Sequence, residues 1–285
     1  MPVSHLLLAL AVVAVWGTNF VVIKWGLAEL PPFLLATLRF GLSSLPFLLF
    51  IRRPATAWWR LAAFGMLLGA GQFGLLFLAM KADISPGLAS LVVQAQVFIT
   101  ILLAGLRVKP AQLAAFGLAL AGMGWIAWQA HQGGAGVSLL GVGLVLSAAS
   151  CWSVANLVAR GAGKVDALGF MVWSSLFALP PLVAMSLAFE GGAAHLVSLA
   201  TAASAAAWAT VAWQAVGNTL FGYGAWNWLL ARHAPATVTP AALLVPVFGM
   251  GASALALGEG LPAWKLGAAG LVMAGLALNL WAASR

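Results

Sequence analysis

The sequence predicts an all-α membrane protein with ten transmembrane helices, arranged as two inverted five-helix repeats. The prediction rests on composition, on ten long apolar runs, and on motifs that recur in the same order in both halves. Of the 285 residues, 64% are hydrophobic and 6% are charged, whereas a water-soluble domain has roughly 25% charged residues. The chain cannot cover its surface with charge, so we infer that its solvent is lipid.

Each apolar run is long enough to be a membrane span, because a helix needs about 20 mostly apolar residues to cross a bilayer. Proline, glycine and charged residues divide the chain into predicted spans at 6–27, 33–51, 61–80, 84–106, 111–130, 138–159, 168–189, 205–230, 234–257 and 263–283. The runs are continuous rather than alternating, and backbone polar groups in lipid must be satisfied internally, which favours helices. The first run is too long for a cleaved signal peptide.

The basic residues are predicted to mark the cytoplasmic side. With the N-terminus inside, the cytoplasmic segments carry Arg52, Arg53, Arg60, Arg107, Lys109, Arg160, Lys164, Arg232 and Arg285. Cytoplasmic loops are enriched in Lys and Arg, so we expect both termini in the cytoplasm. The formal net charge is +8, but the cations are scattered singly. Nucleic-acid binding needs a basic patch or stripe, so we expect no nucleic-acid partner.

The two halves share a repeat. Trp16 precedes Lys24 as Trp152 precedes Arg160, with 136 positions between the equivalent residues. The later matches are Val97-Phe98 with Val247-Phe248, and Gly117 and Gly122 with Gly270 and Gly275. We therefore divide the chain into 1–132 and 133–285. Because each half has an odd number of spans, the second is inverted relative to the first. Inverted repeats are typical of alternating-access transporters, whose substrate site lies near mid-membrane.

Four segments resemble the EamA branch of the drug/metabolite transporter superfamily: VWGTNFVVIKWGL (15–27), PPFLLATLRF (31–40), GLASLVVQAQVFITI (87–101) and LLVPVFGMGASALALGE (243–259). Within that branch the chain most resembles the bacterial exporters of cysteine and O-acetylserine, and it is related to the exporters of aromatic amino acids. The resemblance implies a central cavity, a bacterial inner-membrane location, and efflux of amino acids or related metabolites. The family's Gly-Glu pair after the fourth helix of each half is kept at Gly258-Glu259, whereas the first half lacks the acid after Gly105.

Ionisable groups inside a bilayer are expensive and are functional candidates by default. Arg39 lies about eight residues into its span, roughly 12 Å from the end. It either binds a substrate carboxylate as a planar fork or pairs with backbone carbonyls and holds helices together. Lys24 either extends to the interface or supplies a counter-charge for an anionic group.

Amide and aromatic side chains within the runs complete the predicted substrate site, because amides both donate and accept hydrogen bonds. With Arg39, the candidates are Trp16, Asn19, Gln72, Gln94, Gln96, Trp152, Asn156, Trp173, Tyr223 and Asn227. Asn218 and Trp226 have similar character. Gln94 and Gln96 are two positions apart, so we expect them to face different sides of a continuous helix.

No Asp or Glu lies well inside a predicted span, so a lipophilic cation would find no buried counter-charge. We expect a monomeric exporter or facilitator of amino acids that works by alternating access. No metal-binding spacing, nucleotide loop or nucleophile triad is present, so we expect no cofactor, no metal and no enzyme activity. Three alternatives remain open: a transporter of sugar phosphates or nucleotide sugars, which needs several cations in the cavity, a membrane enzyme, and a structural protein without a polar cavity.

Overall fold

The structure is a computed structural model that describes residues 1–105, 109–133, 136–163, 165–233 and 235–284. Within these ranges nine helical segments are long and apolar enough to cross a membrane, and a bent helix pair supplies a tenth. The predicted all-α class is therefore confirmed. Among the predicted cytoplasmic cations, Arg107, Lys164 and Arg285 lie outside the described residues, as do the last residue of the fourth predicted span and the first of the ninth.

The first five spans are formed by the helices from α1 to α7. They are α1 (Val3–Glu29), α2 (Pro32–Ser44) with a 3-10 turn at Phe47–Leu49, α3 (Trp58–Met66) joined to α4 (Leu75–Ala82) by a π-helical segment at Leu67–Gly74, α5 (Pro86–Val92) followed by α6 (Ala95–Leu103), and α7 (Pro110–His131).

The last five spans repeat this order. They are α8 (Leu139–Gly161), α9 (Ala167–Phe189), α11 (Ala205–Ala212) joined to α12 (Gly222–Arg232) by a π-helical segment at Trp213–Phe221, α13 (Pro235–Val238) followed by a 3-10 turn at Thr239–Leu243 and α14 (Leu244–Leu257), and α15 (Ala263–Ser284).

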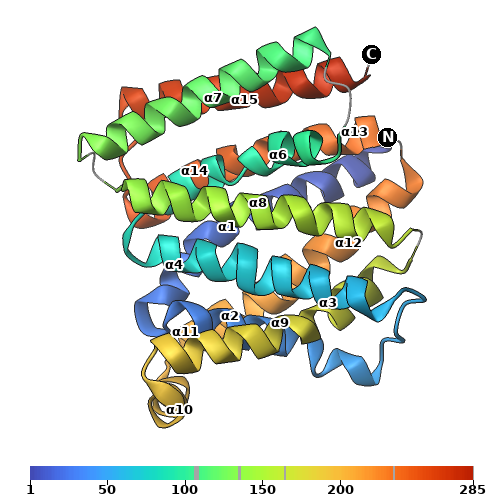
Figure 1. Cartoon of the computed structure of the whole chain (residues 1–285), viewed down its shortest axis with the longest axis vertical. Helices are drawn as coiled ribbons and strands as arrows, with labels where there is room; N and C mark the ends of the chain where they lie inside the picture. Colours follow the sequence, from blue (N-terminus) through green and yellow to red (C-terminus); the bar gives the residue numbers. More distant parts are fainter. Residues whose placement is uncertain (106–108, 134–135, 164, 234, 285) are drawn as a thin grey trace.

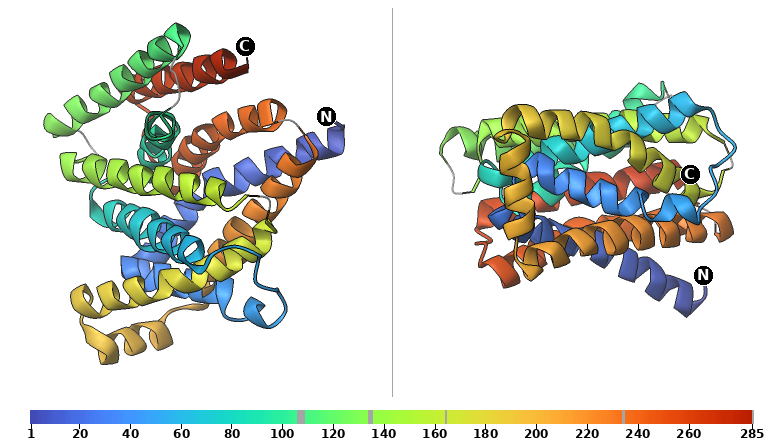
Figure 2. Two further views of the ribbon diagram at one scale, coloured as in Figure 1. Left: turned by 45° about the vertical axis from the view of Figure 1, so that its right-hand side comes forward. Right: turned by 90° about the horizontal axis from the view of Figure 1, so that it is seen from below.

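One helix falls outside the predicted runs. Helix α10 (Gly192–Ala202) meets the following helix at 100° and lies across the ends of its neighbours (Figure 2, right). Gly191 and Gly192 have φ values of +97° and +79°, in the left-handed region that favours glycine. The side chain of Ser204 then accepts a hydrogen bond from the backbone of Ala207 and begins α11. The predicted span at 205–230 is thus preceded by a helix that does not cross the bundle.

The helix contacts have the two-fold pattern that inverted halves produce. Helix α1 packs on α14 as α6 packs on α8, and α8 packs on the third span as α1 packs on the eighth. The second span pairs with the seventh through α2 and α9, and the fifth pairs with the tenth through α7 and α15, which lie side by side in Figures 1 and 2. The predicted arrangement of two inverted five-helix repeats is confirmed by these contacts.

Two of the repeated glycines allow α7 and α15 to approach each other closely. A Cβ at Gly122 would lie 2.8 Å from the Ala268 carbonyl oxygen on α15, and one at Gly275 would lie 2.7 Å from the Ala115 carbonyl oxygen on α7. Small residues allow helix backbones to approach in this way within a membrane. At Gly117 and Gly270, the other repeated pair, an added Cβ would have no neighbouring atom within 4 Å.

Both termini lie at one end of the bundle (Figure 1), and the opposite end contains a buried ion pair. Glu259, between α14 and α15, lies 2.8 Å from the Lys265 ammonium. Its carboxylate also accepts hydrogen bonds from the Ser253 hydroxyl, from the Ser85 hydroxyl at 2.5 Å, and from the Gly87 backbone at 3.1 Å. Because Ser85 and Gly87 begin α5, this carboxylate joins the two halves.

We expect the Glu259 contacts to make stability depend on pH. Burial alone raises the pKa of Glu259, but the hydrogen bonds from Lys265, Ser253, Ser85 and Gly87 outweigh it and lower that pKa below its usual value of 4.5. A lowered folded-state pKa stabilises the fold above the unfolded value, and this contribution is lost as pH falls through the folded value. The melting temperature in detergent should therefore be steady near neutral pH and fall below about pH 4.5.

Glu259→Gln provides the matched comparison. It is expected to melt several degrees lower than the parent at pH 7, because one charge of a buried pair is left unpaired. The two melting temperatures should converge as pH falls through the lowered pKa of Glu259, because the parent carboxyl is then protonated as well. A difference between the two melting temperatures that stays constant as pH is lowered would contradict the role given to the Glu259 carboxylate.

Candidate functional site

A cavity of about 650 Å³ lies between the two halves. Toward the termini it extends to Gly163 and Val165, which connect α8 to α9, and to Leu280 near the end of α15. In the opposite direction its lining ends at Ile23 and Leu76, before the ion pair of Glu259. The cavity therefore approaches the end of the bundle that carries the termini. Its size suits a small molecule, since such sites commonly measure about 300–1,000 Å³.

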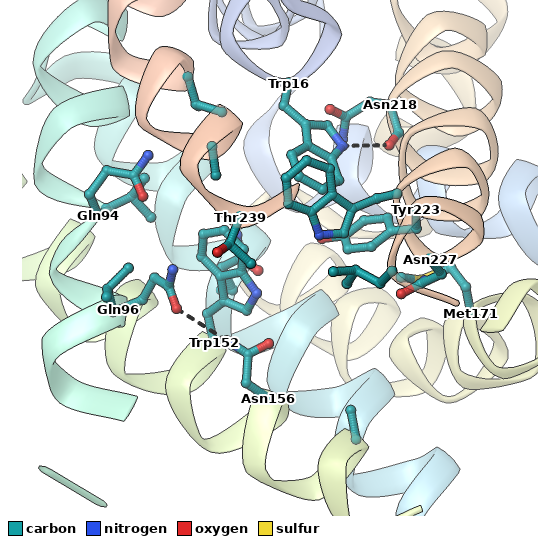
Figure 3. Close-up of a pocket in the computed structure, with 18 of the residues that line it drawn as sticks. Trp16, Gln94, Gln96, Trp152, Asn156, Met171, Asn218, Tyr223, Asn227 and Thr239 are labelled. Carbon is teal, nitrogen blue, oxygen red and sulfur yellow. Dashed lines mark hydrogen bonds between the residues drawn. The ribbon is translucent and has the colours of Figure 1, made fainter. Parts of the chain in front are cut away.

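Nine of the eleven predicted site residues line this cavity. They are Trp16, Asn19, Gln72, Gln94, Gln96, Trp152, Asn156, Tyr223 and Asn227. Figure 3 shows how those that it labels converge on one space from helices of both halves. Among the described lining residues none is Asp, Glu, Lys, Arg or His, and most are amides, aromatic rings and aliphatic side chains.

An aromatic wall forms where α1 meets the eighth span. The Trp16 indole nitrogen donates to the backbone carbonyl of Asn218 at 3.3 Å. Its ring centroid lies 5.4 Å from that of Tyr223 and 5.2 Å from that of Trp226. A Cβ at Gly222 would overlap the Trp16 indole, so the glycine leaves room for the ring. The contact fixes the position of Trp16 against the second half.

An amide pair faces the cavity on the opposite wall. The Asn156 side-chain nitrogen on α8 donates to the Gln96 side-chain oxygen on α6 at 3.1 Å (Figure 3). The Ser153 hydroxyl also donates to the Gln96 backbone carbonyl at 2.9 Å. These bonds connect the fourth span to the sixth, and so the first half to the second.

The expectation that Gln94 and Gln96 face different sides was wrong, because it assumed a continuous helix. Helix α5 ends at Val92 and α6 begins at Ala95. Between them the backbone N–H groups of Gln94, Gln96 and Val97 bond three residues back rather than four, which interrupts the regular α-helix, and both amides line the cavity. Figure 3 shows the two side chains on the same wall.

The two π-helical segments each contribute a buried amide. Gln72 and Asn218 occupy equivalent places, each after a glycine and 146 positions apart, and both line the cavity. Such wide turns occur frequently at functional sites. The side-chain oxygens of Gln72 and of Asn19, also in the lining, are buried and have no hydrogen-bond partner among the described residues. A bound molecule with donor groups would satisfy them.

Arg39 does not line the cavity but lies directly behind its wall. It is wholly buried, and its Nε and Nη2 atoms donate to the Thr219 hydroxyl at 3.3 and 3.1 Å. The guanidinium carbon lies 3.7 Å from the centroid of Phe73, a lining residue. Its Nη1 atom has no partner among the described residues. A buried cation that forms no ion pair with a described carboxylate therefore lies one side chain away from the cavity.

Trp173 also lies outside the lining. Its indole nitrogen donates to the backbone carbonyl of Ile51 at 3.0 Å, and its ring meets Trp58 edge to face at a centroid distance of 5.9 Å. Lys24 does not reach the cavity either, since its ammonium donates to the backbone carbonyl of Met80 at the end of α4, at 2.9 Å. That contact places the Lys24 ammonium near the end of the bundle.

Sequence reasoning missed Thr239 and Met171, which line the cavity (Figure 3). Met171 looks like an ordinary apolar residue near the start of a span. Thr239 begins a short 3-10 turn rather than a regular helix, and nothing in the sequence around it marks this turn as a wall. A polar residue just before Pro240, at the start of an apolar run, was the one available signal.

The chain is similar to proteins of known name over almost its whole length. The pattern of the EamA-like transporter family matches residues 3–128 and 139–281, once in each half. The "Probable amino-acid metabolite efflux pump" of Salmonella typhimurium is 38% identical over 282 residues, covering 96% of this chain and 94% of that protein. Its Escherichia coli counterpart of the same name is 37% identical with the same coverage.

Two more distant proteins also match this chain over nearly its whole length. The "Uncharacterized transporter YoaV" of Bacillus subtilis is 25% identical over 287 residues, covering 97% of this chain and 96% of that one. A solved crystal structure covers 100% of this chain and 99% of its own, with a TM-score of 0.62 at 19% identity. At that identity the likeness concerns the fold alone.

Proposed function

Because the chain belongs to the EamA-like transporter family, we propose that it exports amino acids and related small metabolites across a bacterial inner membrane. The relatives named as probable amino-acid metabolite efflux pumps support this substrate class. The observation that carries it is the cavity, which has amides on several walls and, behind one of them, a guanidinium whose Nη1 atom has no partner among the described residues. An amino acid has a carboxylate for the cation and an ammonium for the amide oxygens.

Of the eleven residues predicted from the sequence, nine form the lining of this site, Arg39 lies behind its wall, and Trp173 lies outside the lining. We assign the substrate ammonium to the unpaired oxygens of Asn19 and Gln72, and the carboxylate to the side of the cavity backed by Arg39. The aromatic rings of Trp16, Trp152 and Tyr223 supply apolar surface for the side chain. Phe73 separates Arg39 from the cavity. The guanidinium therefore attracts the substrate carboxylate through its electrostatic field, or binds it directly after the Phe73 ring rotates.

Transport proceeds by alternating access between the halves 1–132 and 133–285. The present state, in which the cavity extends toward the termini, is the one that receives substrate from the cytoplasm, with both termini cytoplasmic. The monomer suffices, because the cavity is built by one chain. A sugar phosphate fits less well, since phosphate recognition uses several cations and no described lining residue is a cation.

Growth rescue tests the proposal. A host that expresses the protein is exposed to inhibitory concentrations of single amino acids, with the empty vector as control. We expect faster growth for at least one amino acid, because export lowers its internal concentration. Proteoliposomes loaded with the same labelled amino acid should then release it faster than empty-vector preparations. If no amino acid gives rescue or release, the substrate class is wrong.

A further inference from the structure

Four of the five carboxylates in the sequence lie at the end of the bundle opposite the termini. Each of them accepts a hydrogen bond from the start of a helix that belongs to the other half. The positive end of a helix favours a carboxylate, because its first backbone N–H groups have no partner within the helix. The same end of the bundle is therefore joined across the halves at four separate places.

Two of these contacts involve the second and eighth spans. Glu190, after α9, accepts from the backbone N–H groups of Phe33 and Leu34 in α2, at 2.6 and 2.9 Å. Glu29, at the end of α1, accepts from the backbone and hydroxyl of Ser204 before α11, at 2.8 and 2.6 Å. One carboxylate comes from each half, and each holds a helix of the other.

The other two involve the fourth and sixth spans. Glu259 accepts from Ser85 and Gly87 at the start of α5. Asp83, after α4, accepts from the Ser138 hydroxyl at 3.0 Å, and the Ser138 backbone donates to the Asp83 carbonyl at 2.8 Å. Ser138 immediately precedes α8. A pair of neighbouring bonds thus links the loops that follow the third and fifth spans.

The remaining carboxylate behaves differently. Asp166, near the end that carries the termini, accepts from the backbone of Gly169 three residues later in its own helix, at 2.8 Å. This hydrogen bond lies within one helix and does not join the two halves. The carboxylates that join the halves are therefore concentrated at the end that the cavity does not reach, as the positions of Ile23 and Leu76 in the lining show.

We propose that the contacts of Glu29, Asp83, Glu190 and Glu259 form the gate that closes the cavity on the side opposite the termini. This inference rests on the proposed alternating access. To open that side, the halves must separate at the ends of α1, α4, α9 and α14, and all four contacts lie across that separation. Their number favours the state in which the cavity extends toward the termini.

The test uses a reporter cysteine at the closed end of the cavity. Leu76→Cys is made in a Cys151→Ser background, which removes the natural thiol. A membrane-impermeant maleimide is applied to vesicles of each orientation, and the labelling rate from each face is measured. Glu190→Gln replaces an acceptor oxygen with a donor that faces backbone N–H groups. We expect about tenfold faster labelling from the face that carries residue 190, as for the loss of a hydrogen bond to a charge.

Asp166→Asn is the matched control, since it makes the same chemical change at the other end. It should leave labelling from the Glu190 face unchanged. Glu29→Gln, at a more exposed contact, is a second gate variant that is less apt to disturb folding, and it should raise labelling in the same direction. Equal labelling in the parent and both gate variants, or an equal rise in Asp166→Asn, would overturn the proposal. The assay contains no substrate, so a wrong substrate class leaves its result unaffected.

Discussion

Arg39→Met is expected to reduce amino-acid flux about tenfold to hundredfold without lowering thermal stability, which corresponds to losing one charge-assisted interaction. The guanidinium is wholly buried and forms no ion pair with a described carboxylate. Replacing a buried charge with an apolar side chain of similar volume is often neutral or stabilising. If flux is lost while the melting temperature is preserved, the buried guanidinium serves transport and does not stabilise the fold. Flux is measured in proteoliposomes, and melting in detergent.

Two further variants separate the charge from its contacts. Arg39→Lys keeps the charge but not the planar fork, so it should retain more flux than Arg39→Met. Thr219→Val removes the hydroxyl that accepts from Nε and Nη2 and leaves the guanidinium in place. If Arg39→Met lowers the melting temperature strongly and Thr219→Val does the same, the arginine holds helices together, which is the structural alternative that the sequence left open.

Gly249→Val is expected to lower the melting temperature by about 5 °C and to abolish transport, because overpacking at a helix crossing costs about 1–3 kcal/mol. A Cβ at Gly249 would lie 2.5 Å from the Ser90 hydroxyl oxygen and 2.6 Å from the Ser90 Cβ. At the same crossing a Cβ at Gly17 would lie 2.6 Å from the Val245 carbonyl oxygen. Helices α1, α5 and α14 can therefore approach only because these positions lack side chains.

Gly251→Val provides the comparison, because Gly251 is in the same helix and has open space where a Cβ would be placed. Both substitutions carry the same cost of a β-branched residue in a helix. Only the one at Gly249 meets a neighbour. Equal melting temperatures for the two variants would show that the crossing is looser than these distances indicate.

The fold could be predicted from the sequence because a bilayer imposes simple requirements. The length of each apolar run, the odd number of runs per half and the Trp16 and Trp152 motifs were sufficient for ten spans and two inverted repeats. The cavity amides were also accessible to sequence reasoning, since an amide inside an apolar run is costly without a role. Gln72, Gln96 and Asn156 stand out for that reason.

Other features depend on contacts between distant residues, which a single sequence does not reveal. The break between α5 and α6 has no proline or glycine to announce it, so the shared orientation of Gln94 and Gln96 was missed. The partner of Glu190 is 157 positions away, at Phe33. The place of Arg39 behind Phe73 rather than in the lining follows from the packing of the second span on the third.

Blocking the cavity tests most directly whether substrate moves between the two halves. Gln96→Cys, in the lining, and Leu255→Cys, which is 91% exposed on the outside of α14, are each made in the Cys151→Ser background. Each variant is reconstituted and labelled to completion with a bulky maleimide, and amino-acid flux is measured before and after labelling. We predict that labelling stops flux through Gln96→Cys and leaves Leu255→Cys unchanged. Full flux through a completely labelled Gln96→Cys protein would contradict the claim.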